Sequence, residues 1–489
     1  MIKYLLTCIL FLPLMGIFIL LVLSNFFDKD DRFLKIVALN FASLPFIGSL
    51  LVWLLFDRSS TNFQFLIEIF WLPVLNLNLI LGIDGISLFF LLLTTLLIPL
   101  CILISWNSIT RYLNYYLILF LLLEFFLIGV FCVLDLLFFY IFFESILIPM
   151  FLIIGVWGSR ERKILAAYYF FLYTFLSSVL MLISILYIYT QTGTTNYELL
   201  ILFSFTEFEQ KILWLSFFFT FASKVPMLPV HLWLPEAHVE APTAGSVILA
   251  GILLKLGTYG FIRFSLPLFP YASFYFTPLV YTIALSGIIY TSFTAIRQSD
   301  FKRIIAYTSI AHMNLVILGI FSFNSLGIEG ALFQSLSHGF VASALFLIIG
   351  IVYDRYHTRI VKYYGGLALI MPIYSSIFLF FTMANISFPG TSSFIGEFLI
   401  LVGSFKCNTS VTFLGALGII IGAAYSLWLL NRIIFGNLKT QYYTKFLDIN
   451  KREFFAFIPL ILGTIFSGIF PNIFLSYMHP SVNKLIEFL

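Results

Sequence analysis

Charge is scarce in this sequence. Of its 489 residues only 10% are aspartate, glutamate, lysine or arginine, whereas a soluble globular domain carries about 25%. Hydrophobic residues make up 61%. This balance excludes a soluble domain of this length and places the chain in a membrane. The small net charge of +4 gives no indication of nucleic-acid binding.

Motifs that hold cofactors are also missing. The four cysteines are scattered in apolar runs without a CxxC pair, which predicts small core hydrophobes and not metal ligands or disulfides; they are Cys8, Cys101, Cys132 and Cys407. There is no GxGxxG loop, no cysteine cluster for an iron–sulfur centre and no pair of haem ligands. The sequence therefore predicts a chain with no cofactor of its own, which neither binds a dinucleotide nor carries electrons.

Long apolar runs are abundant. A bilayer core requires about 20 apolar residues per helix, and the first run reads as a spanning helix, not a cleaved signal peptide. Residues 57–83 are too polar to span and predict a short surface hairpin. The fourteen predicted spans are 4–25, 33–56, 84–106, 112–132, 134–157, 166–190, 211–236, 243–264, 274–296, 303–323, 329–352, 366–404, 411–432 and 453–478.

Apart from Lys224 and Lys255, the basic residues lie in loops or toward the ends of spans, and they are unevenly distributed. Loops after odd-numbered spans hold 18 of them, and the other side, with both termini, holds 6. Because lysine and arginine accumulate on the side where the chain is retained, both termini are predicted to lie on the outer, electrically positive side. The six are Lys3, Arg58, Lys211, Arg263, Lys406 and Lys484.

A few charged residues lie inside the spans. Burying a charged side chain there costs about a few kcal/mol, and such residues usually mark an ion pathway. They are Glu124, Glu144, Lys224, Lys255 and Glu397. Lys255 is central and flanked by leucines, and Pro149 loosens the helix beside Glu144. For each, the alternative is a packing ion pair or an end residue that reaches the membrane surface; for Glu124 the sequence does not favour either reading.

Two spans contain helix breakers. Pro226 and Pro229 follow Lys224, and Pro389 with Gly390 precedes Glu397. Non-helical backbone at membrane depth must be satisfied by protein or a watery cavity, and two such breaks in corresponding places indicate an inverted-repeat transporter. The predicted fold is an all-α polytopic membrane protein with about 14 transmembrane helices and two inverted five-helix repeats, in which helices 7 and 12 are discontinuous. The predicted segments are 1–111, 112–264, 265–432 and 433–489.

Polar residues also pair at helical spacing, i and i+4, so that each pair faces one way. The pairs are Thr308 with His312, Gln334 with His338, and Ser393 with Glu397. Interhelical hydrogen bonding is predicted for the threonine, glutamine and serine. The histidines exchange protons near neutral pH, so a proton path is favoured for His338, while both readings stay open for His312.

Several strings are recognisable, among them "KVPMLPVHLWLPEAHVEAPTAGS", "FYIFFESILIPMF", "AYTSIAHMN", "SHGFVASALF" and "NISFPGTSSFIGEF". Together they resemble the chain 4 family of NADH:ubiquinone oxidoreductase, respiratory complex I, most closely its plant and algal mitochondrial members. The resemblance runs along nearly the whole chain and is weakest before residue 80.

The resemblance implies a proton-translocating, antiporter-like subunit of the mitochondrial inner membrane, or alternatively of a bacterial plasma membrane. It implies that Glu144 pairs with Lys224, that Lys255 takes up a proton, and that His312 and His338 link the centre to Glu397. It further implies partner subunits that hold NAD, FMN, iron–sulfur clusters and ubiquinone, neighbouring antiporter-like subunits, and surrounding lipids. Two alternatives remain: a subunit of a multi-component sodium/proton antiporter, and a purely structural membrane scaffold.

Overall fold

The computed structural model describes residues 4–26, 31–72, 76–439 and 447–489. Lys3, Lys29 and Lys445, which contribute to the charge distribution above, lie outside these ranges. The described residues divide into two compact units. Unit 1 comprises residues 1–224, 255–277 and 476–489, and unit 2 comprises residues 225–254 and 278–475.

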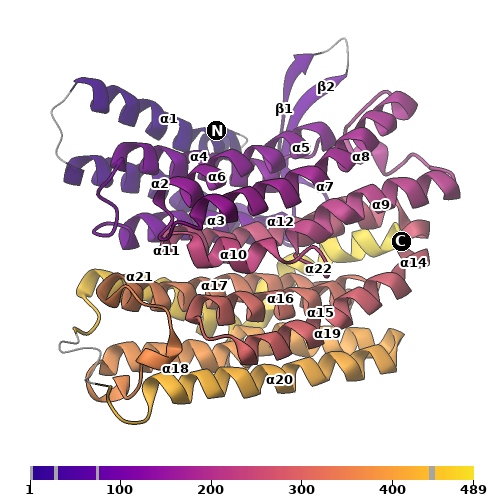
Figure 1. Cartoon of the computed structure of the whole chain (residues 1–489). Helices are drawn as coiled ribbons and strands as arrows, with labels where there is room; N and C mark the ends of the chain where they lie inside the picture. The colour runs from indigo at the N-terminus through magenta and orange to yellow at the C-terminus, as the bar shows by residue number, and fades with distance from the viewer. Residues whose placement is uncertain (1–3, 27–30, 73–75, 440–446) are drawn as a thin grey trace. The chain divides into compact units, whose positions relative to one another are not determined.

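Unit 1 is built from helices and one small β-hairpin (Figure 1). Its elements are α1 (Leu5–Phe26), α2 (Asp31–Leu55), β1 (Gln64–Leu72), β2 (Leu77–Ile83), α3 (Gly85–Ile104), α4 (Leu113–Cys132), α5 (Leu136–Ser145), α6 (Leu147–Trp157), α7 (Lys163–Thr192), α8 (Tyr197–Leu200), α9 (Glu207–Lys224), α12 (Leu254–Gly260, from Lys255), the π-helical turn η4 (Phe261–Ser265), α13 (Leu266–Leu268), α14 (Pro270–Tyr275) and the end of α22 (Pro471–Glu487).

Local sequence explains where several of these helices begin. Asp84 precedes α3 and accepts a hydrogen bond from the Ser87 amide, while the Ser87 hydroxyl bonds back to the Asp84 amide. Asp135 likewise accepts from the amides of Leu137 and Phe138 at the start of α5. Such caps satisfy amides that have no partner inside the helix, which matters more in a membrane than in water.

The hairpin predicted within residues 57–83 is confirmed. Strands β1 and β2 pair antiparallel, with Glu68 opposite Ile80 and Ile69 opposite Leu79. Figure 1 shows the pair rising from one side of unit 1. The polar Asn78 side chain donates a hydrogen bond to Glu68 across the strands, which stabilises their register.

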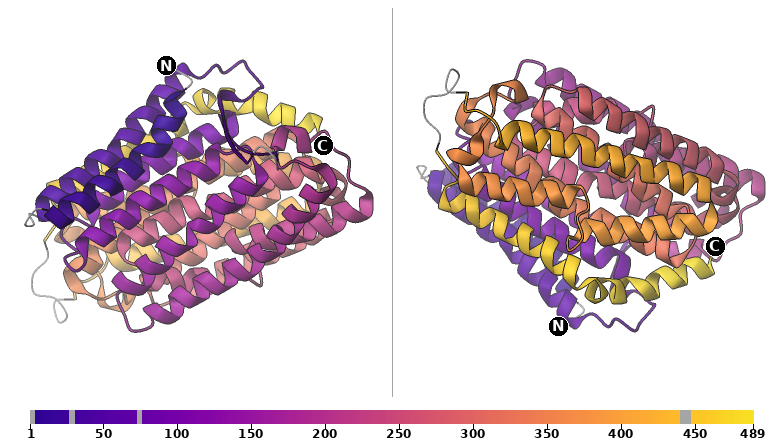
Figure 2. Two further views of the ribbon diagram at one scale, coloured as in Figure 1. Left: turned by 90° about the horizontal axis from the view of Figure 1, so that it is seen from above. Right: turned by 90° about the horizontal axis from the view of Figure 1, so that it is seen from below.

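Unit 2 holds the remaining helices, which run side by side in the view from below (Figure 2). They are α10 (Trp233–Glu240), α11 (Thr243–Ile248), the π-helical turn η3 (Leu249–Leu253), α15 (Thr277–Arg297, from Pro278), α16 (Phe301–Ile320), α17 (Ser325–Tyr356), the 3₁₀ turns η5 (Val361–Tyr363) and η6 (Leu367–Leu369), α18 (Pro372–Asn385), α19 (Ser392–Cys407), α20 (Thr409–Ile434), α21 (Lys451–Ile469) and the start of α22.

Helices α17 and α19 pack closely against each other in unit 2. Glycines make this contact possible, because a Cβ on Gly396 would lie 2.7 Å from the Gln334 Cα, and one on Gly330 would lie 2.7 Å from the Ile400 amide nitrogen. Small residues let backbones approach in this way in membrane proteins. The approach brings the side chains of Gln334 and Glu397 together.

Twelve helices within the described residues are long and apolar enough to cross a membrane. Many of their outward side chains are large and apolar, such as Leu54 on α2 and Leu176 on α7. An apolar outer surface over polar buried side chains is what lipid surroundings require. The chain is therefore an all-α, multi-pass membrane protein with one small hairpin.

Some sequence predictions are wrong. The last predicted span, 453–478, ends earlier, since α21 stops at Ile469 and α22 begins at Pro471. Cys101 and Cys132 are buried core residues as predicted, but Cys8 and Cys407 are exposed. A helix places some of its apolar residues toward lipid, so an apolar run alone does not bury every cysteine within it.

Candidate functional site

Glu144 lies at a weak point of unit 1. Helix α5 ends at Ser145 and α6 begins at Leu147, because Pro149 has no amide hydrogen for the Ser145 carbonyl. The Ser145 hydroxyl donates a hydrogen bond to the Ile141 carbonyl. The predicted loosening of the helix beside Glu144 is confirmed.

Glu144 and Lys224 lie within electrostatic reach of each other. Neither the Glu144 carboxylate nor the Lys224 ammonium has a hydrogen-bond partner among the described residues. The Lys224 Nζ atom lies 4.6 Å from the centre of the Phe143 ring, and an aromatic face attracts a cation. The lysine is thus held beside the acid without a direct hydrogen bond between them.

Helical geometry stops directly after Lys224. Helix α9 ends at this residue, and the next helix, α10, begins at Trp233. Pro226 and Pro229 lie between them, and Pro226 has a positive φ of 25°. The predicted break is therefore confirmed, and it leaves Lys224, 2% exposed, at the end of a buried helix.

Lys255 occupies the centre of a fully buried span. It is the thirteenth of the 26 residues in the continuous helix Thr243–Leu268, and its exposed fraction is 0%. Its helical segment α12 lies between the π-helical turns η3 and η4. Such turns widen a helix locally and are frequent at functional sites.

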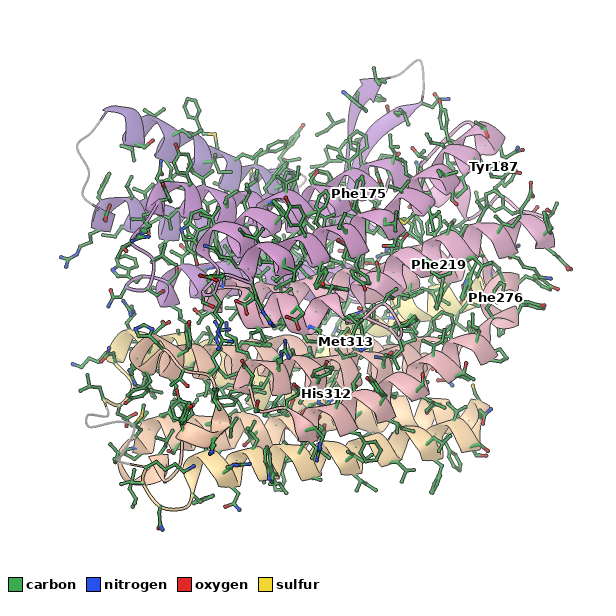
Figure 3. The ribbon with its side chains drawn as sticks, viewed as in Figure 1. Phe175, Tyr187, Phe219, Phe276, His312 and Met313 are labelled. Atoms are coloured by element: carbon green, nitrogen blue, oxygen red, sulfur yellow. The ribbon has the colours of Figure 1, made fainter. Side chains whose placement is uncertain are left out.

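Unit 2 contains a second group of predicted residues. The Glu397 Oε1 atom on α19 lies 2.9 Å from the His312 Nδ1 atom on α16. The same oxygen accepts a hydrogen bond of 3.0 Å from the Gln334 Nε2 atom on α17. Figure 3 labels His312 among the helices of this unit. Three helices therefore meet at one carboxylate.

His338 extends this group. The ring centres of His312 and His338 lie 6.0 Å apart, and the Gln334 side chain accepts a hydrogen bond from Ser337. The histidine rings are too far apart for direct proton exchange but close enough for one bridging water.

The predictions for the three polar neighbours have different outcomes. Interhelical bonding is confirmed for Gln334, which contacts Glu397, and for Ser393, which bonds to the Ala384 carbonyl at the end of α18. The prediction is wrong for Thr308, whose hydroxyl bonds to the Ile305 carbonyl of its own helix. A threonine in a helix often satisfies its hydroxyl in this local way.

The second break also has the predicted place. Helix α18 ends at Asn385 and α19 begins at Ser392. Between them lie Pro389 and Gly390, whose φ is +95°. Only glycine adopts this conformation readily, so the residue after the proline allows the chain to turn into α19.

A small cavity adjoins this second group. Its lining includes His312, Glu397, Asn385 and Tyr425. Its volume of about 20 Å³ is enough for one water molecule. The His312 Nε2 atom has no hydrogen-bond partner among the described residues. A water here would link the histidine and the acid to the end of the broken helix.

Some relevant residues were missed or misplaced. Arg263, counted above as a loop residue, lies inside a span and pairs with Asp84. Lys302 and Arg359, which are among the 18 basic residues assigned to loops after odd-numbered spans, are 1% exposed. Lys302 donates to the Ala241 carbonyl and Arg359 to that of Val239. These cations satisfy carbonyls near helix ends, which a loop count cannot reveal.

Glu124 on α4 is fully buried. Neither of its carboxylate oxygens has a hydrogen-bond partner among the described residues. The packing ion pair considered for Glu124 is therefore not seen within the described part of the chain. No group of His, Cys, Asp and Glu in that part could hold a metal ion.

Broken helices that carry buried lysines, acids and histidines in a multi-pass bundle define the class of antiporter-like membrane subunits. A family model described as "NADH:quinone oxidoreductase/Mrp antiporter, TM" matches residues 133–422. The chain is 58% identical to NADH-ubiquinone oxidoreductase chain 4 of Marchantia polymorpha, over 98% of this chain and 96% of that one. It is 48% identical to NADH-quinone oxidoreductase subunit M of Rhodobacter capsulatus, over 99% and 96%.

Solved structures agree. A chain in the respiratory complex I of Thermus thermophilus with bound NADH has a TM-score of 0.88 at 29% identity, with 100% of both chains covered. A chain of the Mrp complex from Dietzia superposes with a TM-score of 0.87 at 18% identity, over 99% and 98%, and shows the fold alone. The chain belongs to the NADH:quinone oxidoreductase/Mrp antiporter family of membrane subunits, in its chain 4 branch.

Proposed function

We propose that this chain moves protons across the mitochondrial inner membrane as a subunit of NADH:ubiquinone oxidoreductase. The observation that carries the proposal is Lys255, an ammonium group at the centre of a span that is completely buried. A permanent charge there would destabilise the protein by about a few kcal/mol. A lysine that cycles between its charged and neutral forms can take up a proton and release it, which explains why a charge is placed there.

In unit 1, Glu144 and Lys224 act on Lys255. Repulsion between two ammonium groups favours release of a proton from Lys255 when the Lys224 side chain moves toward it, and attraction by Glu144 draws Lys224 back. The absence of a direct hydrogen bond between Glu144 and Lys224 supports this role, because a loosely held lysine can move. The end of α9 at Lys224 supplies the hinge.

In unit 2, Glu397 is the terminal proton acceptor. His338 and His312 pass the proton toward it, since imidazole both accepts and donates a proton near neutral pH. The contact of 2.9 Å between His312 and Glu397 supports the last transfer. Gln334 donates to the same carboxylate oxygen, which positions the acid whether or not it carries a proton.

The finer architecture is part of this proposal. The twelve continuous spans, together with a discontinuous helix 7 from α9 and α10 and a discontinuous helix 12 from α18 and α19, make fourteen. Helices 4 to 8 and 9 to 13 form two inverted repeats, with segments 1–111, 112–264, 265–432 and 433–489. Each break falls in the fourth helix of its repeat, as an inverted-repeat carrier requires.

An even number of crossings, fourteen, places both termini on the same side of the membrane. The distribution of basic residues indicates that this is the outer side. We expect a small tag fused after Leu489 to be accessible from the intermembrane space in intact mitochondria without the outer membrane. The basic loops, such as that holding Arg160 and Arg162, face the matrix by the same rule. The measurement is protease protection of the tag. Digestion of the tag only after the inner membrane is opened would contradict the topology.

The energy for transport comes from partner subunits. This chain offers no metal-binding cluster among its described residues, and NAD, FMN, iron–sulfur clusters and ubiquinone belong to other subunits in the proposal. Neighbouring antiporter-like subunits and lipids cover its apolar sides.

Purification in mild detergent separates this function from that of a sodium/proton antiporter. We expect flavin- and iron–sulfur-containing proteins to co-purify with the chain, together with NADH oxidation that reduces ubiquinone. Co-purification only with membrane subunits that lack redox centres would favour the antiporter instead. Flavin absorbance and iron content of the purified complex provide the two readouts.

A further inference from the structure

Unit 1 contains a buried ion pair that the proposed proton path does not use. The Arg263 Nη2 atom lies 2.5 Å from the Asp84 Oδ1 atom, and the two side chains are only 4% and 6% exposed. Asp84 sits at the start of α3 and Arg263 in the π-helical turn η4. The guanidinium group of Arg263 is therefore buried, and the carboxylate of Asp84 balances its positive charge.

Aromatic rings enclose the guanidinium group of Arg263. Its central carbon lies 5.1 Å from the ring centre of Phe63, 5.5 Å from that of Tyr197 and 5.4 Å from that of Tyr259. Rings at these distances attract a cation and keep water from the parts of the guanidinium group that they cover. The charge is held in one place by contacts on several sides.

Arg263 follows Lys255 in the same continuous helix, Thr243–Leu268. Lys255, Tyr259 and Arg263 follow one another at intervals of four residues, so Arg263 is about 12 Å further along the helix than Lys255. The Arg263 Nε atom donates to the Tyr259 hydroxyl at 3.2 Å. A line of polar side chains thus runs from the buried lysine to the ion pair.

Between Lys255 and Arg263, the ring of Tyr259 packs against two phenylalanine rings and forms a ring layer with them. Its ring centre lies 5.2 Å from that of Phe131 and 6.3 Å from that of Phe90, and those two rings stack at 5.3 Å. The Tyr259 hydroxyl donates to the Phe131 carbonyl at 3.3 Å. Its proton is therefore directed to the backbone and not along the line.

A cavity adjoins the ion pair of Asp84 and Arg263. It has a volume of about 120 Å³, room for several waters, and its lining includes Asp84, Arg263, Glu198 and Lys484. Lys484 donates to Asn62 beside the hairpin. In the topology proposed above, the hairpin and the C-terminal residues lie on the outer side, so outer water reaches the ion pair.

We propose that Asp84, Arg263 and Tyr259 form an outer seal that prevents protons from passing between Lys255 and the outer water. The inference rests on the proposed proton path through Lys255. A fixed guanidinium repels hydronium ions, as arginines do in water channels, and it cannot release its own proton. The ring layer removes the water chain that a proton would need. The seal makes Lys255 exchange protons only with the inner side and unit 2.

The test measures passive proton flux through the intact complex in liposomes, without NADH and with the quinone site inhibited. The main variant combines Asp84→Asn with Arg263→Gln, because removing both charges leaves no unpaired buried ion. We expect its proton leak under an imposed membrane potential to rise several-fold above the parental complex. Arg263→Lys, which keeps the positive charge, should leak at most slightly.

A third variant locates the leak. Adding Lys255→Ala to the double variant should return the flux to the parental level, because the path then lacks its proton carrier. NADH oxidation before inhibitor addition verifies assembly of the double variant and of Arg263→Lys. Should the double variant fail to assemble, Tyr259→Ala provides a second opening, because it removes one ring of the layer and leaves the ion pair in place, and its expected leak is smaller.

Two results would overturn the seal. One is parental flux in an assembled double variant, which would make the ion pair only a link between α3 and η4. The other is a leak that persists when Lys255 is replaced. Either can occur while NADH-driven pumping behaves as proposed, so failure of the seal is distinguishable from failure of the proposed function.

Discussion

Replacing Lys255 by alanine is expected to abolish most proton translocation without preventing assembly of the complex. The lysine is completely buried in the middle of a span, so removing its charge should not destabilise the helices. Loss of an essential proton carrier reduces the rate of proton transfer by about 10²-fold or more. We therefore expect pumping coupled to NADH oxidation to fall strongly in reconstituted vesicles.

A matched control separates loss of function from loss of a lysine as such. Lys406 is exposed in the last turn of α19, and Lys406→Ala should pump at the parental rate. Equal pumping by Lys255→Ala and Lys406→Ala would favour the structural scaffold over the proton carrier.

Replacing Glu397 by glutamine is the second change with a large expected effect. Glutamine has nearly the same shape and can keep hydrogen bonds to His312 and Gln334, but it cannot take up a proton. Because His312 Nδ1 contacts the carboxylate at 2.9 Å, the variant leaves the histidine without a proton acceptor. We expect pumping to fall by about 10²-fold while the thermal stability of the complex changes little.

The comparison for this variant is Glu487→Gln, which makes the same chemical change at an exposed position near the end of α22. It should pump as the parental complex does. Pumping measured as acidification outside the vesicle per NADH oxidised reports both variants on one scale. Normal pumping by Glu397→Gln would remove the carboxylate from the path.

Much of the fold could be predicted because its signals are local. Apolar runs gave the spans, and Pro226, Pro229 and Pro389 gave the breaks, since a proline removes a hydrogen bond wherever it stands in a helix. The polarity of residues 57–83 gave the hairpin. Lys255 was also visible, because a lysine among leucines at membrane depth has no ordinary explanation.

Long-range partners could not be predicted from the residues themselves. Asp84 and Arg263 are 179 positions apart, and His312 and Glu397 are 85 positions apart. The sequence around each of these residues does not identify its partner. An interhelical hydrogen bond of Gln334 could be predicted, but its partner, Glu397, could not. The pairing depends on the close approach of α17 and α19 at Gly396.

The errors have the same origin. Arg263, Lys302 and Arg359 lie near span ends, where a window of hydropathy cannot distinguish a solvated loop from a buried turn. Tertiary contacts decide between them: Asp84 holds Arg263, and backbone carbonyls at helix ends hold Lys302 and Arg359. The cysteines Cys8 and Cys407 were misassigned because both a helix core and a lipid-facing surface are apolar.

Cycling of a proton at Lys255 is the central claim, and Lys255→Arg tests it most directly. Arginine keeps the positive charge and much of the length of lysine but does not release its proton at accessible pH. Proton translocation per NADH oxidised is measured in vesicles that contain the intact variant complex. The account predicts that Lys255→Arg assembles and fails to pump through this subunit, as Lys255→Ala does. Pumping by Lys255→Arg at the parental rate would contradict it and leave Lys255 as a fixed charge.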